Sequence, residues 1–482
     1  MRNTAVTLGV WVALAGCGGG AAGDGGEAGS SSGSGDSGTT AGSTAGTTAN
    51  TSASTSAQTT ASTTDGGSSA DSGSSSGDAS AGSSSETTAA ARCGDAVVAG
   101  DEACDDGNDA LGDGCNPDCS ESFAPLWWTR VDSATPSPEC LRNLAVASDG
   151  TVAAVGEFEG AAGDQNLLFG RWAADGSEAW LNGWDSPTDD ETVFVTDRGW
   201  GVALADDGTV FVAGNVVDAG VQTIWVSRRA DDGSAVWVHD GQGGSGQGVA
   251  LAATLDPAGL LWIGGWIEEL GQGEGLLRSY TADGDVVDNF IIGGNYEPDE
   301  LYDLEADDVG LAGAGRRTQG PSTDFYVEYQ DWADRVGWVA QYDGPTHDED
   351  NAYAVGIDAQ GRVLALGYED TNHPVLRRFA PENELELEQY DPGYMGLQPF
   401  DLVLDPGGGW ILVGATPDAT MWLARYDDDG ALLWSREHAE PGTTAITAFA
   451  AERRADGSIV VGGCFSDGAN DPDHAFVAAF AP

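Results

Sequence analysis

From residue 121 to the C-terminus, apolar and polar residues alternate in short runs, a pattern that predicts half-buried β-strands. The runs come in pairs that are joined by an Asp-Gly type of turn, and the second run of each pair closes with a glycine. The segment from the turn to this closing glycine recurs seven times over the same six-residue step, at 150–156, 208–214, 259–265, 309–315, 361–367, 408–414 and 457–463.

Successive segments start 58, 51, 50, 52, 47 and 49 residues apart, and fixed periods of this size indicate stacked supersecondary units. Each unit has a second turn that leads to an aromatic residue in a further apolar run, as Gly176 leads to Trp180 and Gly430 leads to Trp434. Asp-Gly between alternating apolar runs favours a β-hairpin. Two hairpins per unit give a four-stranded antiparallel sheet, which is typical of a β-propeller blade.

The two ends of the repeat region predict a closed ring. After Gly463 there is room for one more strand, over 475–480, and its missing partner is the run 126–131 that precedes the first unit. We therefore expect an all-β fold, a seven-bladed β-propeller of four-stranded antiparallel blades over 121–482, in which the N-terminal strand completes the last blade. Closing the ring in this way removes exposed sheet edges.

Two cysteines support the ring. Cys140 immediately precedes the first inner strand, and Cys464 directly follows the closing Gly463 of the last unit. Because the first and last blades of a ring are neighbours, we predict a disulfide between these residues, although they are 324 positions apart.

Recurring side chains predict how the blades contact one another. A set of arginines occupies corresponding strand positions, and we expect them to form ion pairs or to stack on aromatic rings. We interpret the tryptophans at the blade edges as packing between blades. The arginines are Arg171, Arg228, Arg278, Arg377 and Arg425.

Single blades within 121–482 resemble bacterial Asp-Gly…Trp propellers, including pyrroloquinoline-quinone-type repeats with an Asp-x-x-Gly-x-x-x-Trp hairpin. The resemblance implies a propeller fold of the quinoprotein kind. Those relatives usually have eight blades, whereas seven are counted here, so we carry no quinone cofactor over from them.

The N-terminus has the pattern of an export signal. Arg2 is the one charged residue before the apolar stretch 5–15, which is too short to span a bilayer. The stretch ends in Leu-Ala-Gly followed by Cys17, which resembles a bacterial lipobox. The resemblance implies cleavage of a signal peptide over 1–16 and lipidation of Cys17; an ordinary signal peptide with a chance cysteine is the alternative. Gly18 after the cysteine favours the outer membrane.

Residues 17–91 predict a disordered tether. From residue 18 onwards they are almost all Gly, Ala, Ser, Thr and Asp, with no aromatic residue, Pro, Val, Leu, Ile or Met. Such a composition cannot bury enough apolar surface to offset the entropy of ordering the chain. Its many hydroxyl groups are also compatible with glycosylation.

Four cysteines follow within a short segment that we call the cysteine module (residues 92–120): Cys93, Cys104, Cys115 and Cys119. Export favours two disulfides over a zinc site, and the spacing leaves all three connectivities open. The cysteine spacing, with Asp-Asp-Gly-Asn at 105–108 and Gly-Asp-Gly-Cys at 112–115, resembles the Myxococcus cysteine-rich repeat. That resemblance implies display on the surface of an exported protein and no catalytic residue.

The charge balance limits the partners. The 482 residues include 19 Lys+Arg, all of them Arg, against 78 Asp+Glu, for a net charge of −59. A field of this sign repels phosphate backbones and anionic lipid, which excludes nucleic acid and any membrane contact beyond the lipid anchor. We expect a monomer that binds an unknown protein or glycan partner.

Candidate chemistry is sparse. The chain has no nucleophile elbow, phosphate loop, paired metal-binding histidines or lysine, so we assign no catalytic residue. Acids in the loops before several inner strands form a candidate metal site, with calcium as the cofactor to consider and solvated surface acids as the alternative. These acids are Asp189, Asp190, Glu191, Asp299, Glu300, Asp348, Glu349 and Asp350.

Three functions follow as hypotheses. The first is a cell-surface lipoprotein that displays a non-catalytic propeller for binding a protein or glycan. The second is a propeller enzyme, either a metal-dependent hydrolase or lyase or a quinoprotein-like enzyme. The third, a component of outer-membrane protein assembly, rests on analogy of fold alone, and the long tether argues against it.

Overall fold

The computed structural model describes residues 93–482 except 101, 110–111, 134–137, 161–162, 187–195, 219, 241–246, 270–271, 293–298, 320–321, 334–336, 346, 348, 370–372, 391–396, 407 and 469–472. The predicted signal peptide, Cys17 and the tether therefore lie outside the described residues. No helix in the described part of the chain is long and apolar enough to cross a membrane.

The described residues form seven sheets of four antiparallel strands each. Strand β1 (Pro125–Val131) comes first and belongs to the last blade. Blades one to three contain β2 (Glu139–Val146), β3 (Val152–Glu159), β4 (Gln165–Trp172), β5 (Glu178–Trp184); β6 (Arg198–Leu204), β7 (Val210–Asp218), β8 (Val221–Arg229), β9 (Ala235–His239); β10 (Gly248–Leu255), β11 (Leu261–Glu269), β12 (Gln272–Tyr280) and β13 (Val286–Ile292).

Blades four to seven continue in the same order along the chain. They contain β14 (Glu300–Ala306), β15 (Gly310–Gln319), β16 (Ser322–Asp331), β17 (Gly337–Tyr342); β18 (Asn351–Ile357), β19 (Val363–Glu369), β20 (His373–Phe379), β21 (Leu385–Tyr390); β22 (Gln398–Leu404), β23 (Trp410–Ala415), β24 (Met421–Tyr426), β25 (Leu432–His438); β26 (Ala445–Arg453), β27 (Ile459–Ser466) and β28 (His474–Phe480).

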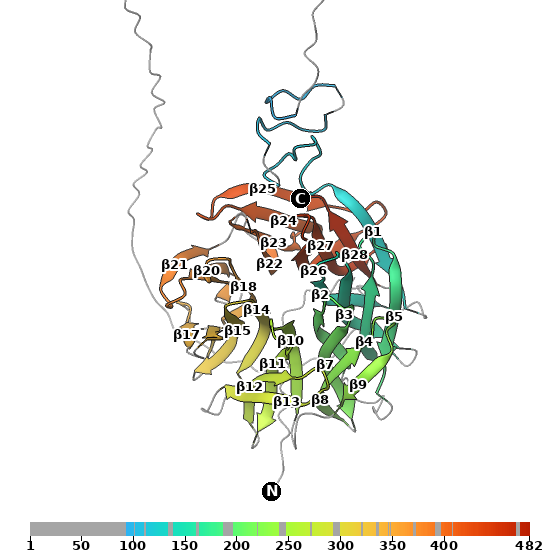
Figure 1. The fold of residues 1–482 in the computed structure, drawn as a ribbon, viewed down its shortest axis with the longest axis vertical. Helices are drawn as coiled ribbons and strands as arrows, with labels where there is room; N and C mark the ends of the chain where they lie inside the picture. The colour runs from blue at the N-terminus through green and yellow to red at the C-terminus, as the bar shows by residue number, and fades with distance from the viewer. Residues whose placement is uncertain are drawn as a thin grey trace, which may run out of the picture. The chain divides into compact units, whose positions relative to one another are not determined.

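The sheets are arranged around a central axis, with the first strand of each blade innermost (Figure 1). The last blade has the order β26-β27-β28-β1, so the N-terminal strand supplies its outer edge. Trp128 of β1 stacks on Phe476 of β28 with ring centroids 4.2 Å apart. The predicted seven-bladed ring and its closure by the two chain ends are therefore confirmed.

The core lies between neighbouring blades. One cluster, for example, packs Val155 and Phe169 of the first blade against Val212 and Trp225 of the second, and all four are at most 1% exposed. Sheet residues alternate between two faces, so each blade presents an apolar face to the blade on either side. This packing fixes the radial position of the inner strands.

Outer-strand tryptophans add a directional contact between blades. The indole N–H of Trp180 in β5 donates to the carbonyl of Asp231, which lies in the Asp-Asp-Gly turn of the next blade, at 3.0 Å. The same contact recurs from Trp127 to Ala174 at 3.1 Å, from Trp237 to Ala282 at 2.9 Å and from Trp338 to Pro381 at 2.9 Å. The tryptophans at the blade edges thus join neighbouring blades.

At the closure of the ring, the cysteine module provides the carbonyl that accepts the tryptophan N–H, because the last blade has no turn at this position. In the last blade the two outermost strands, β28 and β1, come from opposite ends of the chain, so no turn connects them. Trp434 of the sixth blade instead donates to the carbonyl of Gly112, at 2.7 Å and buried. Gly112, Asp113 and Gly114 repeat the x-Asp-Gly order of the three turns that begin at Ala174, Asp231 and Ala282. The module thus fits against the closure of the ring.

Further contacts hold the module in place. Phe123, three residues after the module ends, stacks on Phe480 at 4.4 Å and lies 5.5 Å from the Trp434 ring, while its amide donates to the carbonyl of Ala481 at 3.1 Å, so the chain that leaves the module is anchored on the propeller.

One disulfide joins the first and last blades, and another lies within the cysteine module. Cys140 of β2 and Cys464 of β27 form a disulfide between the first and last blades, with Cα atoms 4.7 Å apart. Within the cysteine module, Cys104 is bonded to Cys115, with Cα atoms 5.7 Å apart.

The second pair of the module is in the thiol form in this structure, and a second disulfide there stays a prediction. Cys93 and Cys119 are thiols that hydrogen-bond to each other, and burial together with this neighbour raises the pKa of Cys119 to about 12. Because Cys104 and Cys115 are bonded, Cys93–Cys119 is the pairing that remains.

Candidate ligand-binding channel

Each inner strand carries a β-bulge at the same place. The pairing with the second strand skips one residue in all seven blades, directly after the residue that faces the closing glycine. In the first blade Leu141 faces Gly156, and a Cβ on Gly156 would overlap the carbonyl oxygen of Cys140. The equivalent overlap occurs at every closing glycine, so the bulge explains why this glycine recurs.

The bulged residues form a belt around the channel, which we call the aromatic belt. Five of the seven are aromatic, and all seven line the central cavity. The rings of Tyr302 and Tyr353 lie 5.2 Å apart, those of Phe400 and Phe449 4.9 Å apart, and the Arg142 guanidinium lies 4.5 Å from the Phe449 ring. The belt consists of Arg142, Trp200, Leu251, Tyr302, Tyr353, Phe400 and Phe449.

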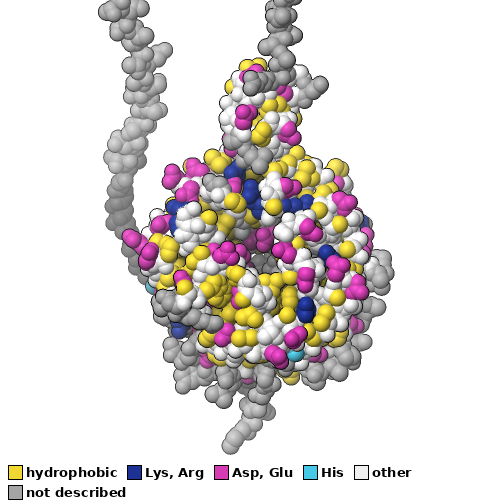
Figure 2. Space-filling view, viewed as in Figure 1, with side chains coloured by type: hydrophobic (Ala, Val, Ile, Leu, Met, Phe, Trp, Pro, Cys, Tyr) yellow, Lys and Arg dark blue, Asp and Glu magenta, His cyan; other side chains and the backbone are white. Residues whose placement is uncertain are grey.

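The cavity has a volume of about 750 Å³ and is lined by the inner strands of all seven blades. Figure 2 shows the centre of one face hollowed between the blades, with acidic side chains beside it. Beyond the belt the lining is mixed, because acidic and amide side chains alternate with apolar residues along the inner strands. Leu144, Val202, Leu304 and Leu402 of these strands are buried in the packing between blades. The volume is that of a small-molecule or side-chain binding site.

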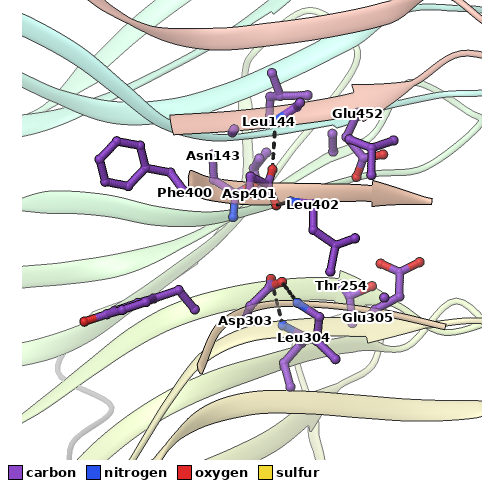
Figure 3. A pocket seen from close by; sticks show the side chains of 18 of the residues that line it. Asn143, Leu144, Thr254, Asp303, Leu304, Glu305, Phe400, Asp401, Leu402 and Glu452 are labelled. Atoms are coloured by element: carbon purple, nitrogen blue, oxygen red, sulfur yellow. Dashed lines mark hydrogen bonds between the residues drawn. The ribbon is translucent and has the colours of Figure 1, made fainter. Parts of the chain in front are cut away.

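Two aspartates inside the channel are bound to the backbone. The carboxylate of Asp303 accepts N–H groups from Leu304 at 2.9 Å and from Val355 of the next blade at 2.8 Å. Asp401 accepts N–H groups from Leu402 at 2.7 Å and from Ala451 of the next blade at 2.8 Å (Figure 3). Each aspartate follows its bulge directly and ties one inner strand to the next.

Burial is the main influence on the pKa values of these aspartates. It raises the pKa of Asp303 to about 6, against the lowering effect of the two backbone donors. It also raises the pKa of Asp401 well above its usual value, and the negative charge of Asp303 adds to the effect.

Two glutamates lie further along the same channel. Glu305 on β14 and Glu452 on β26 come from opposite parts of the ring and lie at the same end of the cavity in Figure 3. Burial raises the pKa of Glu305 well above its usual value, and the charge of Glu452 raises it further. Burial and the charge of Asp303 raise the pKa of Glu452 to about 7. The two carboxyl groups therefore interact unfavourably when both are ionised.

Arginines neutralise acids near the belt but not deeper in the channel. Arg142 pairs with Glu157, and Arg316 pairs with Glu300 at 2.9 Å. Within the described residues, none of the four channel acids, Asp303, Glu305, Asp401 and Glu452, has an ion-pair partner. The interior of the channel thus carries uncompensated acidic groups.

The acids predicted from the sequence as metal ligands lie elsewhere. Asp189, Asp190, Glu191 and Asp348 are outside the described residues. Asp299 accepts the Thr318 N–H at 2.9 Å and lies 3.6 Å from Arg317, and burial raises its pKa to about 6.

The remaining candidates also have local roles. Glu300 is paired with Arg316, and Asp350 accepts the Gly344 N–H. Glu349 is exposed and is the candidate that lines the channel in the described part of the loops. No three His, Cys, Asp or Glu side chains among the described residues are grouped closely enough to hold a metal ion.

The sequence prediction placed the candidate acids in the loops before the inner strands and therefore missed the channel acids. A signal was present within the strands. Asp303, Glu305, Asp401 and Glu452 interrupt inner strands that are otherwise mostly apolar or small. An acid on the innermost strand of a blade faces the axis or a neighbouring blade, so it calls for a specific partner.

No family model matches this chain, and no curated protein matches it in sequence. Two solved structures are similar in fold. The Chaetomium thermophilum Sqt1 crystal structure is 12% identical and covers 74% of this chain and 98% of its own, with a TM-score of 0.43. The β-propeller domain of the Trilobed protease from Pyrococcus furiosus is 10% identical and covers 72% of this chain and 94% of its own, with a TM-score of 0.44. The likeness concerns the propeller fold alone.

Proposed function

We propose that this chain is an exported, lipid-anchored surface protein whose propeller binds a protein or glycan partner at the central channel without catalysing a reaction. The aromatic belt carries the proposal, because seven equivalent bulges place large side chains around one cavity of about 750 Å³. Aromatic rings supply large contact areas at a small cost in conformational entropy, and such rings are typical of binding sites.

Two of the four channel acids have a structural role. Asp303 and Asp401 each accept two backbone N–H groups, so their carboxylates are already used in joining neighbouring blades. A general base needs a free carboxylate within reach of a substrate proton, so the enzyme hypothesis would have to use Glu305 or Glu452. A hydrolase screen that detects turnover abolished by Glu305→Gln would favour the enzyme hypothesis instead.

Display at the surface rests on the sequence. Cys17 stands at the end of a lipobox-like motif, and residues 18–91 provide a tether that keeps the propeller away from the membrane. The resemblance of the cysteine module to the Myxococcus cysteine-rich repeat points to the same location.

Two experiments test the proposal. Proteinase K, which needs no basic residue, should release the wild-type propeller from intact cells by cutting the tether, and Cys17→Ser should shift the protein from the membrane fraction to the soluble fraction. A protein that resists proteinase K on intact cells but is cut after lysis contradicts surface display.

Binding is tested with the full mature chain on glycan and peptide arrays. Tyr353→Ala in the belt should abolish any specific signal, whereas Phe290→Ala on the exposed outer strand β13 should leave it unchanged. Equal effects of the two substitutions would contradict a binding site in the channel.

A further inference from the structure

Three tyrosines form one continuous surface where blades four and five line the channel, and we call it the tyrosine face (Tyr302, Tyr353 and Tyr368). Tyr302 and Tyr353 belong to the aromatic belt, and their ring centroids lie 5.2 Å apart. Tyr368 on β19 lies edge-on to Tyr353, with centroids 5.9 Å apart, and it also lines the cavity. All three side chains are half-buried, so the tyrosine face offers a ligand part of three rings and their hydroxyl groups.

Unused hydrogen-bonding groups lie around the tyrosine face. The Tyr353 hydroxyl has no hydrogen-bond partner among the described residues, and burial raises its pKa to about 12, so it remains a donor at neutral pH. Gln398 on β22 is exposed, lines the cavity and has no side-chain hydrogen bond within the described part of the chain. The Tyr368 hydroxyl donates to the carbonyl of Pro399 at 3.0 Å, which places the neighbouring Gln398 beside the tyrosine face.

One free carboxylate completes this group. Glu349 is exposed and lines the cavity, and its negative charge adds to the effect of burial on the pKa of Tyr353, so its carboxylate lies near that hydroxyl. Glu349 has no ion-pair partner among the described residues, whereas Glu300 is paired with Arg316. A free carboxylate accepts hydrogen bonds from the hydroxyl groups of a ligand, and it repels a ligand that carries carboxylates or phosphates.

Aromatic rings flanked by hydroxyl, amide and carboxylate groups suit a ligand that has an apolar face and several hydroxyl groups. A pyranose ring has both, because the C–H groups of one face pack on an aromatic ring while its hydroxyls donate to and accept from polar side chains. A purely apolar ligand would cover the Tyr353 hydroxyl and the Gln398 amide without replacing their hydrogen bonds to water, which costs free energy.

The channel is less suited to a peptide. An extended peptide binds to a free strand edge through backbone groups, and the inner strands are the edges that face the channel. Four N–H groups of these strands, in blades four to seven, already donate to Asp303 and Asp401. The side chains of Leu304 and Leu402 are buried between blades, so they do not form a pocket for an apolar side chain of a peptide.

We propose that the partner of the channel is a neutral glycan, which stacks on the tyrosine face, donates hydroxyl hydrogen bonds to Glu349 and forms hydrogen bonds with Tyr353 and Gln398. This inference rests on the proposed function and specifies the class of its ligand. A peptide partner is the result that would contradict it.

An array tests the class of ligand with the full mature chain. It carries neutral oligosaccharides of glucan, galactan, mannan, xylan and chitin, uronate-containing oligosaccharides, and peptides. We expect signals on neutral oligosaccharides that are lost in Tyr353→Ala, and none on the uronate-containing ones. Equal signals on neutral and uronate-containing oligosaccharides would overturn the inference. Tyr353-dependent signals on peptides alone would also overturn it while the proposed function stands, and the absence of any Tyr353-dependent signal would contradict both.

Variants test the contacts by calorimetry with the neutral oligosaccharide that gives the strongest array signal. Tyr353→Phe keeps the ring and removes only the hydroxyl, and it should weaken binding by about fivefold. Glu349→Gln removes a charged acceptor at an exposed position and should weaken binding by about tenfold. Unchanged melting temperatures would show that both variants fold.

Tyr329→Phe is the matched control, because it also removes one hydroxyl but lies on β16, outside the lining of the cavity. It should bind the oligosaccharide as the wild type does. An equal loss in Tyr329→Phe would assign the effect to the fold rather than to the channel and would overturn the inference. Wild-type affinity in Tyr353→Phe would overturn it as well, because the ligand would then contact the ring alone.

Discussion

Replacing Trp434 with Phe removes one hydrogen bond between the cysteine module and the propeller while keeping an aromatic ring beside Phe123. The indole N–H lies 2.7 Å from the Gly112 carbonyl, in a buried position, and Trp434 is 6% exposed. Loss of a donor to a buried carbonyl costs about 1–3 kcal/mol. The smaller ring buries less apolar area, which adds about 1 kcal/mol. We expect the free energy of unfolding to fall by about 2–4 kcal/mol.

Trp180→Phe is the internal control. Its indole makes the same contact with the Asp231 carbonyl, at 3.0 Å, but at an exposed site where water replaces the lost donor. We therefore expect a loss of about 1 kcal/mol. Urea denaturation of the two variants gives the comparison directly.

Hydrogen exchange localises the effect. In Trp434→Phe the amides of residues 112–124 should exchange faster, because the module loses a contact to the sixth blade, whereas Trp180→Phe should leave these amides unchanged. Equal destabilisation by the two substitutions, with unchanged exchange in the module, would refute the view that Gly112 takes the place of the missing turn.

The remaining predictions concern the bulge, the ring closure and the channel acids. Gly156→Ala places a Cβ against the carbonyl of Cys140 and should cost about 3 kcal/mol in a urea titration, while Gly468→Ala, in open space, should change stability by less than about 0.5 kcal/mol; similar values would contradict the steric explanation. Replacing Cys140 and Cys464 together by Ser should lower the melting temperature. Loop entropy sets an upper limit of about 5 kcal/mol on the loss in free energy of unfolding, and the loss should stay below it because β1 also closes the ring. An unchanged melting temperature would show that the disulfide does not stabilise the fold. The pKa of Glu452 is about 7 in the folded protein and has its ordinary value of 4.5 in the unfolded chain, so the folded state binds this proton more tightly. The resulting stabilisation is complete below about pH 4.5 and is lost as the pH rises through about 7. Unfolding free energies at pH 5 and pH 8 should therefore differ, and Glu452→Gln should reduce that difference by about 2 kcal/mol; an undiminished difference would assign it to other groups.

The sequence by itself determined the architecture. Strand alternation, Asp-Gly turns and the closing glycine are local features, and each is repeated seven times, so the blade and its number can be counted without coordinates. The closure between β1 and β28 could be predicted for the same reason, because one strand is left over at each end. The bulge beside the closing glycine could not be predicted from the sequence, because it depends on how closely Gly156 approaches a backbone carbonyl of the neighbouring strand.

The tertiary structure alone decided where the acids act. Asp299 and Asp350 stood out in the sequence, but the folded chain places them against backbone N–H groups. Glu305 and Glu452 are 147 residues apart and come together only because the ring brings blades four and seven to one axis. In a chain with 78 acidic residues, composition cannot distinguish a solvated carboxylate from one in a channel. Their physical difference is burial, and burial is a property of the closed ring rather than of any single blade.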